Sequence, residues 1–248
     1  MDRARLARWI SHLPLTVSRC LMCGAPGTHG LDLCPGCLAE LPRNTVCCTH
    51  CALPMAEPGR LCGRCQIKPP PWQAVCVPFR YAWPLDHLAA RYKFAAQLAS
   101  GRSLAALWHT AAQPERPAAI IPVPLHHVRL RQRGYDQALE LARVISRDLH
   151  VPLRTDILWR RRATTAQSTL DAAARRRNVR DAFTVRNAAA LPAHVAVFDD
   201  VMTTGTTLAE CTRVLQRAGV ARVDVWALAR VPAPGQAAVS RRQSPHSA

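Results

Sequence analysis

The feature that most constrains the fold of this chain is a lattice of eight cysteines near its N-terminus. They form four C-x-x-C pairs, and each pair begins 14 residues after the previous one. A C-x-x-C turn presents two thiolates to one metal ion, and two such turns complete the tetrahedral four-cysteine site typical of structural Zn²⁺. The lattice therefore predicts two structural zinc ions. Its members are Cys20, Cys23, Cys34, Cys37, Cys48, Cys51, Cys62 and Cys65.

Two arrangements of the four pairs would give such sites. Consecutive pairs would form two successive zinc ribbons, whereas alternating pairs would form one cross-braced module. Consecutive pairing closes the smaller loops and therefore loses less chain entropy. Disulfides are the competing interpretation, but a reducing compartment disfavours them. Redox catalysis normally uses one C-x-x-C beside a strand rather than four in series.

The formal net charge of +17 comes almost entirely from arginine, because Lys68 and Lys93 are the only lysines. Such a charge favours polyanionic partners, namely nucleic acid, phosphorylated metabolites or anionic membrane. A GC-rich genome also produces this composition, so charge alone does not decide among them. No apolar stretch reaches the roughly 18 residues of a membrane span, and the first residues lack the apolar core of a signal peptide. We expect a cytoplasmic protein without a membrane span.

Two proline-containing breaks divide the chain. The first is QIKPPPWQ at residues 66–73, and the second is QPERP at residues 113–117, after a stretch with apolar residues at helical spacing. Residues beyond 230 are rich in Pro, Gly, Ser, Gln and Arg, a composition typical of disorder. We expect a zinc-binding module over residues 1–70, a linker and helical connector over 71–117, one further domain over 118–230 and a disordered tail over 231–248.

In the third of these regions, short apolar runs alternate with helical patterns. The runs AAIIPVP (118–124), HVAVF (194–198) and ARVDVWALA (221–229) indicate strands. Residues 135–150 and 208–218 have the apolar spacing of amphipathic helices. This alternation of strands and helices predicts an α/β domain in which helices flank a parallel sheet.

An acidic pair and a hydroxyl-rich loop follow the second strand, in VFDDVMTTGTTL at residues 197–208. Ligands of open parallel sheets bind beyond the carboxyl ends of strands. Free N–H groups at the start of the next helix favour a phosphate, and Gly205 lets the backbone approach it. Because Asp199 and Asp200 would repel a phosphate, we assign them to sugar hydroxyls and Mg²⁺ of the same ligand. The stretch predicts a ribose-5-phosphate site completed by Thr203, Thr204, Thr206 and Thr207; an ordinary strand-turn-helix with a capped N-terminus is the alternative.

The segment VAVFDDVMTTGTT resembles the phosphoribosyl-pyrophosphate motif of type I phosphoribosyltransferases. This resemblance implies that Asp199 and Asp200, the candidate catalytic residues, face the ribose 2′ and 3′ hydroxyls of phosphoribosyl pyrophosphate bound with Mg²⁺. It also implies that residues 203–207 hold the 5′-phosphate.

A wider resemblance covers roughly residues 18–230. The cysteine lattice, IPVPLHHVRLRQRGYDQALELAR (121–143) and RRATTAQSTLDAAARRRNVRDAF (161–183) are together similar to the ComF family. That family joins an N-terminal zinc module to a phosphoribosyltransferase domain and is linked to DNA uptake in natural competence. The fold class implied is therefore a type I phosphoribosyltransferase-like α/β domain with a small cysteine-rich module. One departure is Tyr135-Asp136, where the family more often has Phe-Asn.

The resemblance also suggests where the remaining ligand groups bind. PVPL (122–125) stands where these enzymes keep a pyrophosphate-binding loop, and Arg129, Arg131 and Arg133 follow it as candidates for pyrophosphate or DNA. A solvated basic loop is the alternative interpretation. Residues that resemble a mobile flap, or else structural caps and exposed charges, are Thr164, Gln167, Arg175 and Asn178.

Three functions follow as hypotheses. The first is magnesium-dependent phosphoribosyl transfer, in which pyrophosphate leaves as a nucleophile attacks the anomeric carbon. The second is non-catalytic binding of single-stranded DNA, favoured by the arginines and disfavoured by the scarcity of aromatic residues for stacking. The third is docking of a helicase-like competence partner by the zinc ribbons.

Overall fold

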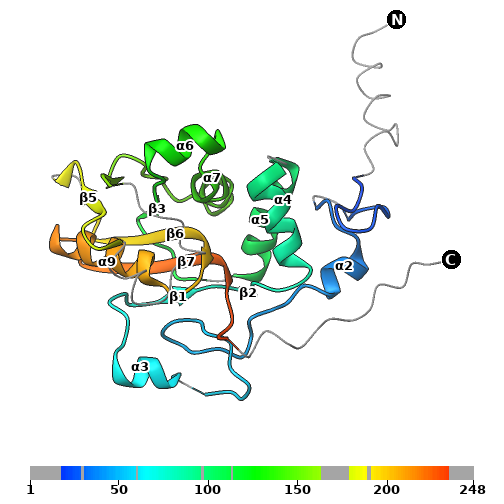
Figure 1. Ribbon diagram of the computed structural model, residues 1–248, viewed down its shortest axis with the longest axis horizontal. Helices are drawn as coiled ribbons and strands as arrows, with labels where there is room; N and C mark the ends of the chain where they lie inside the picture. Colours follow the sequence, from blue (N-terminus) through cyan, green and yellow to red (C-terminus); the bar gives the residue numbers. More distant parts are fainter. Residues whose placement is uncertain are drawn as a thin grey trace, which may run out of the picture.

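The computed structural model describes residues 18–28, 31–59, 61–95, 98–112, 114–162, 179–188 and 191–234. A parallel sheet lies at the centre of the described chain, with helices on both of its faces and the two cysteine-rich loops at its periphery (Figure 1). The predicted fold class, an α/β domain with a parallel sheet flanked by helices and an N-terminal cysteine-rich module, is confirmed.

The sheet has five strands, which run in the order β1-β7-β6-β3, with β2 also paired to β7. All four pairings are parallel. The short strands β1 and β2 come from the stretch 71–117, expected as a linker and helical connector, so this stretch adds to the sheet as well as supplying helices. The strands are β1 (Val75–Cys76), β2 (Phe79–Arg80), β3 (Ala119–Pro122), β6 (His194–Met202) and β7 (Arg222–Arg230).

Strand β6 is longer than the apolar run that predicts it. It continues through the acidic pair because β7 offers partners: Asp199 pairs with Ala227, and Met202 pairs with Arg230. On its other side β3 ends opposite Phe198. The acidic pair therefore lies on a strand, but beyond the carboxyl end of the neighbouring strand.

The helices cover the two faces of the sheet and bury two separate apolar clusters. Successive residues of β6 alternate between these clusters, as the period of a strand requires. Val195 and Val197 pack in the cluster that includes residues of α9, whereas Ala196 and Phe198 pack with residues of α4, α5 and α7. The helices are α4 (Leu85–Ala95), α5 (Leu98–Ala111), α7 (Gln137–Leu149) and α9 (Thr206–Arg217).

Smaller elements complete the described chain. Helix α6 (His127–Arg133) follows β3, and β4 (Leu158–Arg160) pairs antiparallel with β5 (Phe183–Val185). The flap candidates Thr164, Gln167, Arg175 and Asn178 lie outside the described residues, as does the tail beyond residue 234. None of the helices in the described ranges is long and apolar enough to cross a membrane.

Each cysteine-rich loop carries one short helix at its second C-x-x-C pair. These helices are α2 (Pro35–Ala39), which Cys34 caps, and α3 (Gly63–Ile67), which follows Cys62. In Figure 1, α2 lies near α4 and α5, whereas α3 lies on the opposite side of the sheet. We call the loop of residues 18–41 the first ribbon and that of residues 44–68 the second ribbon.

Candidate functional site

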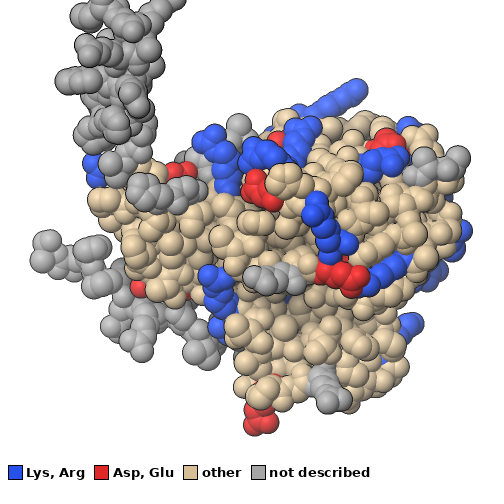
Figure 2. Space-filling view, turned by 180° about the vertical axis from the view of Figure 1, so that it is seen from behind, with Lys and Arg blue, Asp and Glu red and all other residues tan. Residues whose placement is uncertain are grey.

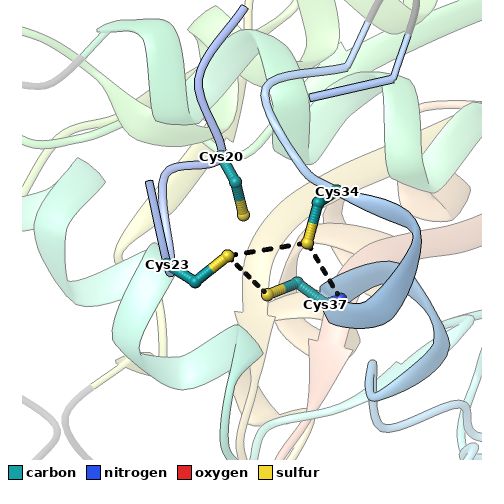
Figure 3. Close-up of side chains that lie close together, drawn as sticks. All are labelled: Cys20, Cys23, Cys34 and Cys37. Atoms are coloured by element: carbon teal, nitrogen blue, oxygen red, sulfur yellow. Dashed lines mark hydrogen bonds between the residues drawn. The ribbon is translucent and has the colours of Figure 1, made fainter. Parts of the chain in front are cut away.

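The eight lattice cysteines come together in two groups of four. The sulfur atoms of Cys20, Cys23, Cys34 and Cys37 all lie within 4.8 Å of one another and face a common centre (Figure 3). Cys48, Cys51, Cys62 and Cys65 form the second group in the same way. The pairs are therefore consecutive rather than alternating.

The spacing of the sulfur atoms fits tetrahedral zinc. Zn–S bonds of about 2.3 Å at tetrahedral angles place sulfurs about 3.8 Å apart. Cys23 Sγ lies 3.6 Å from Cys34 Sγ, and Cys51 Sγ lies 3.7 Å from Cys62 Sγ. Both groups therefore support a structural zinc ion.

Backbone N–H groups stabilise one thiolate in each group. The N–H of Cys62 donates to Cys48 Sγ at 3.3 Å. Burial alone would raise the pKa of Cys48, but such N–H groups outweigh it and lower the pKa to about 7; the same balance lowers the pKa of Cys20 to about 6. Burial and neighbouring sulfurs instead raise the pKa of Cys37 and Cys65. A bound zinc ion would displace the protons of these thiols, because cysteine ligates zinc as a thiolate.

The acidic pair of β6 forms a charged cluster with a lysine from α4. Lys93 Nζ lies 2.6 Å from Asp200 Oδ2, and the Asp200 side chain is only 18% exposed. Burial would raise the pKa of Asp200, but the Lys93 ammonium outweighs it and holds the pKa below its usual value. Burial, together with the Asp200 carboxylate, holds the pKa of Asp199 well above its usual value. The pair therefore combines a firmly ionised carboxylate with a carboxyl group that keeps its proton more readily.

The hydroxyl-rich loop ends at the N-terminus of α9. Gly205, the N-cap residue of this 12-residue helix, has a φ of 74°, in the left-handed region, and offers no side chain as a cap. The hydroxyl oxygens of Thr204 and Thr206 lie 2.6 Å apart. The N–H groups of the first turn and the helix dipole favour an anion here.

Gly205 is also constrained by packing. A Cβ atom at this position would lie 2.7 Å from Met202 Cε and 3.1 Å from the Trp72 ring. Any side chain at position 205 would therefore clash with Met202 and Trp72. Glycine is required here by its positive φ and by this contact, in addition to any approach of a ligand to the backbone.

The three candidate arginines lie on helix α6 rather than in a loop. Arg131 is exposed, whereas Arg129 and Arg133 are half-buried. Burial, with a contribution from Arg133, lowers the pKa of Arg129. Arg129 is close enough to Arg160 to perturb its pKa, and Asp199 acts on Arg160 as well. Arg160 thus lies electrostatically between Arg129 of helix α6 and Asp199 of the acidic pair.

Two charged residues near the acidic pair were missed by the sequence reasoning. Lys93 comes from the expected helical connector, and its rarity as one of two lysines was the one available signal. Arg160 is 8% exposed and lies 5.2 Å from the centroid of the Phe183 ring. Its strand, β4, has only three residues, too few to carry a recognisable pattern.

Asp136, at the departure from the ComF pattern, has a structural role. Its Oδ1 accepts a hydrogen bond from the N–H of Leu139 and caps α7, while Oδ2 accepts one from the N–H of Leu125 at 2.9 Å. Burial raises the pKa of this carboxyl group. Asn also caps helices well, but its amide nitrogen cannot accept a hydrogen bond. The two oxygens of Asp136 each accept one, and so hold the loop after β3 against α7.

Comparison with known proteins agrees with this architecture. The double zinc ribbon domain matches residues 13–66. Competence protein F of Haemophilus influenzae is 36% identical over 222 residues, which cover 86% of this chain and 96% of that protein. DNA utilization protein YhgH of Escherichia coli K12 is also 36% identical over 222 residues, covering 85% of this chain and 96% of the relative. The chain belongs to the competence protein F (ComF) family.

A more distant likeness is to a solved structure. Glutamine phosphoribosylpyrophosphate amidotransferase from B. subtilis, complexed with ADP and GMP, is 19% identical. The match has a TM-score of 0.34 and covers 52% of this chain and 25% of that chain.

Proposed function

We propose that the chain binds phosphoribosyl pyrophosphate with Mg²⁺ at the carboxyl edge of the sheet and transfers its phosphoribosyl group. The observation that carries this proposal is the sequence of groups at the end of β6. Asp199 and Asp200 stand beyond the end of β3, and the glycine-capped N-terminus of α9 follows them a few residues later. The names of the relatives, competence protein F and DNA utilization protein, support a role in the uptake and use of DNA. No disulfide joins the described cysteines, as expected of a protein in the reducing cytoplasm.

In this proposal the acidic pair and the loop that follows it bind different parts of the ligand. The N–H groups and hydroxyls of residues 203–207 bind the 5′-phosphate. Asp199 and Asp200 accept hydrogen bonds from the ribose hydroxyls, and their oxygens are the ligand type that Mg²⁺ prefers. Bound Mg²⁺ would stabilise the charge of the leaving pyrophosphate. Lys93 keeps Asp200 ionised and partly neutralised until the ligand arrives.

Arg129 is the member of the arginine set assigned to the pyrophosphate. It is half-buried and lies near Arg160, so a pyrophosphate beside it would meet two guanidinium groups. These groups match phosphate oxygens in bidentate fashion and stabilise the leaving group as the glycosidic bond breaks.

Calorimetry with phosphoribosyl pyrophosphate and Mg²⁺ tests the proposal through the sign of one effect. Asp200→Asn and Asp199→Asn should abolish binding, because each removes an acceptor for ribose or metal. A site that merely attracted phosphate would bind more tightly after either change, by about 1 kcal/mol. Thr203→Val and Thr207→Val should weaken binding by a smaller factor, because each removes a hydroxyl that contacts the 5′-phosphate.

Asp156→Asn is the matched control, because Asp156 is exposed and pairs with Arg154 at 2.8 Å. This variant should bind as the wild type does. Tighter binding by the Asp199 and Asp200 variants would contradict the proposal.

A second candidate function is the binding of single-stranded DNA. The net charge of +17 supports it, and Figure 2 shows Lys and Arg side chains spread over one face among fewer acidic ones. Contacts to the phosphate backbone release counterions, so the affinity should fall steeply with added salt. A salt titration compared between the wild type and Arg131→Gln tests this role, and an affinity independent of salt would contradict it.

A further inference from the structure

The last residue of β7, Arg230, joins the second ribbon to residues 202–207, which we call the phosphate loop. Arg230 is 3% exposed. Its Nε donates to the carbonyl of Cys51, a cysteine of the second zinc cluster, at 2.9 Å. Its Nη1 donates to the carbonyl of Met202 at 3.1 Å and also to the carbonyl of Thr203. One buried guanidinium group therefore holds a zinc loop and the phosphate loop together.

Two more residues of the same region contact the next two positions of the loop. Arg64, which lies between two cysteines of the second cluster, donates through Nη1 to the carbonyl of Thr204 at 3.2 Å. Trp72 packs under Gly205, and its Nε1 donates to the carbonyl of His50 in the second ribbon at 2.7 Å. Contacts from the ribbon and its flanking residues thus reach four consecutive loop residues, 202–205.

These contacts fix the direction of the backbone N–H groups. In a trans peptide the C=O of one residue and the N–H of the next point in opposite directions. Because the carbonyls of residues 202, 203 and 204 face the arginines, the N–H groups of residues 203, 204 and 205 point away from them. Within the described chain, none of these three N–H groups donates to another residue. Successive free N–H groups with one orientation form an anion-binding concavity.

We propose that Arg230, assisted by Arg64 and Trp72, is a positioning residue through which the zinc-loaded second ribbon orients the phosphate-binding loop. The identity of the ligand, phosphoribosyl pyrophosphate, rests on the proposed function. The contacts between the second ribbon and the loop do not depend on it. Zinc with four thiolates carries a net charge of about −2, and a buried charge needs compensation. Arg230, on which Cys51 and Cys62 act electrostatically, contributes to this compensation and uses its other N–H groups on the loop.

The coupling has a thermodynamic consequence that can be measured. If zinc in the second cluster raises the affinity of the loop for its ligand, the bound ligand must raise the affinity of that cluster for zinc by the same factor. The first cluster makes none of these contacts, so its zinc should be unaffected. Each molecule therefore contains its own control.

The first experiment compares two conservative changes at opposite ends of β7. Arg230→Lys keeps the charge but loses the fork of donors, and should weaken binding of phosphoribosyl pyrophosphate with Mg²⁺ by about tenfold, as expected when charged hydrogen bonds to carbonyls are lost. Arg222→Lys is the matched control, because Arg222 pairs with Glu115 and Asp224 at the other edge of the sheet. If Arg230→Lys does not fold, the milder variants Arg64→Gln and Trp72→Phe should each weaken binding by about threefold. Unchanged affinity in all the folded variants would overturn the inference.

The second experiment measures zinc release to a chromophoric chelator, a readout that does not depend on activity. The ligand should slow release of the second zinc but not of the first, and Arg230→Lys should remove this protection. If the wild type binds no phosphoribosyl pyrophosphate, the proposed function fails, yet Arg230→Lys should still speed release of the second zinc while the first is released as in the wild type. No change in the release of the second zinc would overturn the inference on its own.

Discussion

The two ribbons have the same cysteine spacing but are set into the protein differently. In the first cluster Cys23 is exposed and Cys34 and Cys37 are half-buried, whereas all four cysteines of the second cluster are buried. The first ribbon reaches the rest of the chain through a few polar contacts, such as Arg91 Nη1 to the carbonyl of Leu21 at 2.6 Å, and through one edge of an apolar cluster. The second cluster packs in the same core as residues of β6 and α9.

The segment that follows the second ribbon accounts for its deeper position. After the second ribbon the proline run leads to Trp72, and Gln216 of α9 donates to the carbonyl of Pro71 at 2.9 Å. This segment turns the second ribbon back against the sheet, next to residues 202–205. The same cysteine motif therefore lies at the periphery in one copy and packs against the loop after β6 in the other.

The largest expected effect comes from breaking the second cluster. Cys48→Ser should remove one zinc, and because structural zinc contributes folding free energy on the order of 10 kcal/mol, it should unfold the ribbon and abolish ligand binding. Cys20→Ser should remove the other zinc and unfold the first ribbon while ligand binding persists. Metal analysis, thermal unfolding and calorimetry on both variants check this.

Cys47→Ser provides the control for that comparison, because Cys47 neighbours the second cluster without belonging to it. It should keep both zinc ions. Equal loss of ligand binding in the Cys20 and Cys48 variants would show that the ribbons are not functionally distinct.

The same division between the ribbons should appear when the metal is removed without mutation. Protein purified without chelator should contain close to two zinc equivalents, one for each four-cysteine group. A chelator should then release them in two phases, the faster from the first cluster, because its cysteines are more exposed. Ligand affinity should survive the first phase and disappear in the second. Loss of affinity in the first phase would contradict the division of roles.

The smallest effect concerns a single contact of the first ribbon. Ser103 Oγ lies 3.4 Å from both the N–H and the Oδ2 of Asp32, a distance at which hydrogen bonds are weak. Ser103→Ala should therefore lower the free energy of unfolding by less than about 1 kcal/mol and leave both zinc content and ligand affinity unchanged. Chemical denaturation measures the first quantity, and a loss of several kcal/mol would mean that the first ribbon is attached far more firmly than its contacts suggest.

The sequence predicted what local patterns encode. The cysteine lattice predicted the two groups, since ligand spacing is a property of short segments. The apolar runs at 118–124, 194–198 and 221–229 predicted β3, β6 and β7, and the order of elements predicted the parallel sheet. The two-residue strands β1 and β2 went unrecognised because they are too short to show a period.

Contacts between distant segments lay beyond prediction from the sequence. Arg230 ends a strand whose pattern is otherwise apolar, and its contact with Cys51 spans 179 residues. Lys93 reaches Asp200 from a helix assigned only as a connector. The acidic pair and its loop are visible in the sequence as a candidate site, but the cations that contact them, Lys93, Arg64 and Arg230, reach them only through tertiary packing.

The place of β7 in the sheet has a consequence for how the protein is made. It pairs with β1, β2 and β6, so the strand with the most neighbours is the last strand of the described chain to leave the ribosome. The ribbons can take up zinc early, because each closes within a short segment. The sheet, and with it Arg230, can assemble only when translation has passed residue 230, and such long-range pairing is slow. A nascent chain should therefore hold metal well before it can hold a ligand.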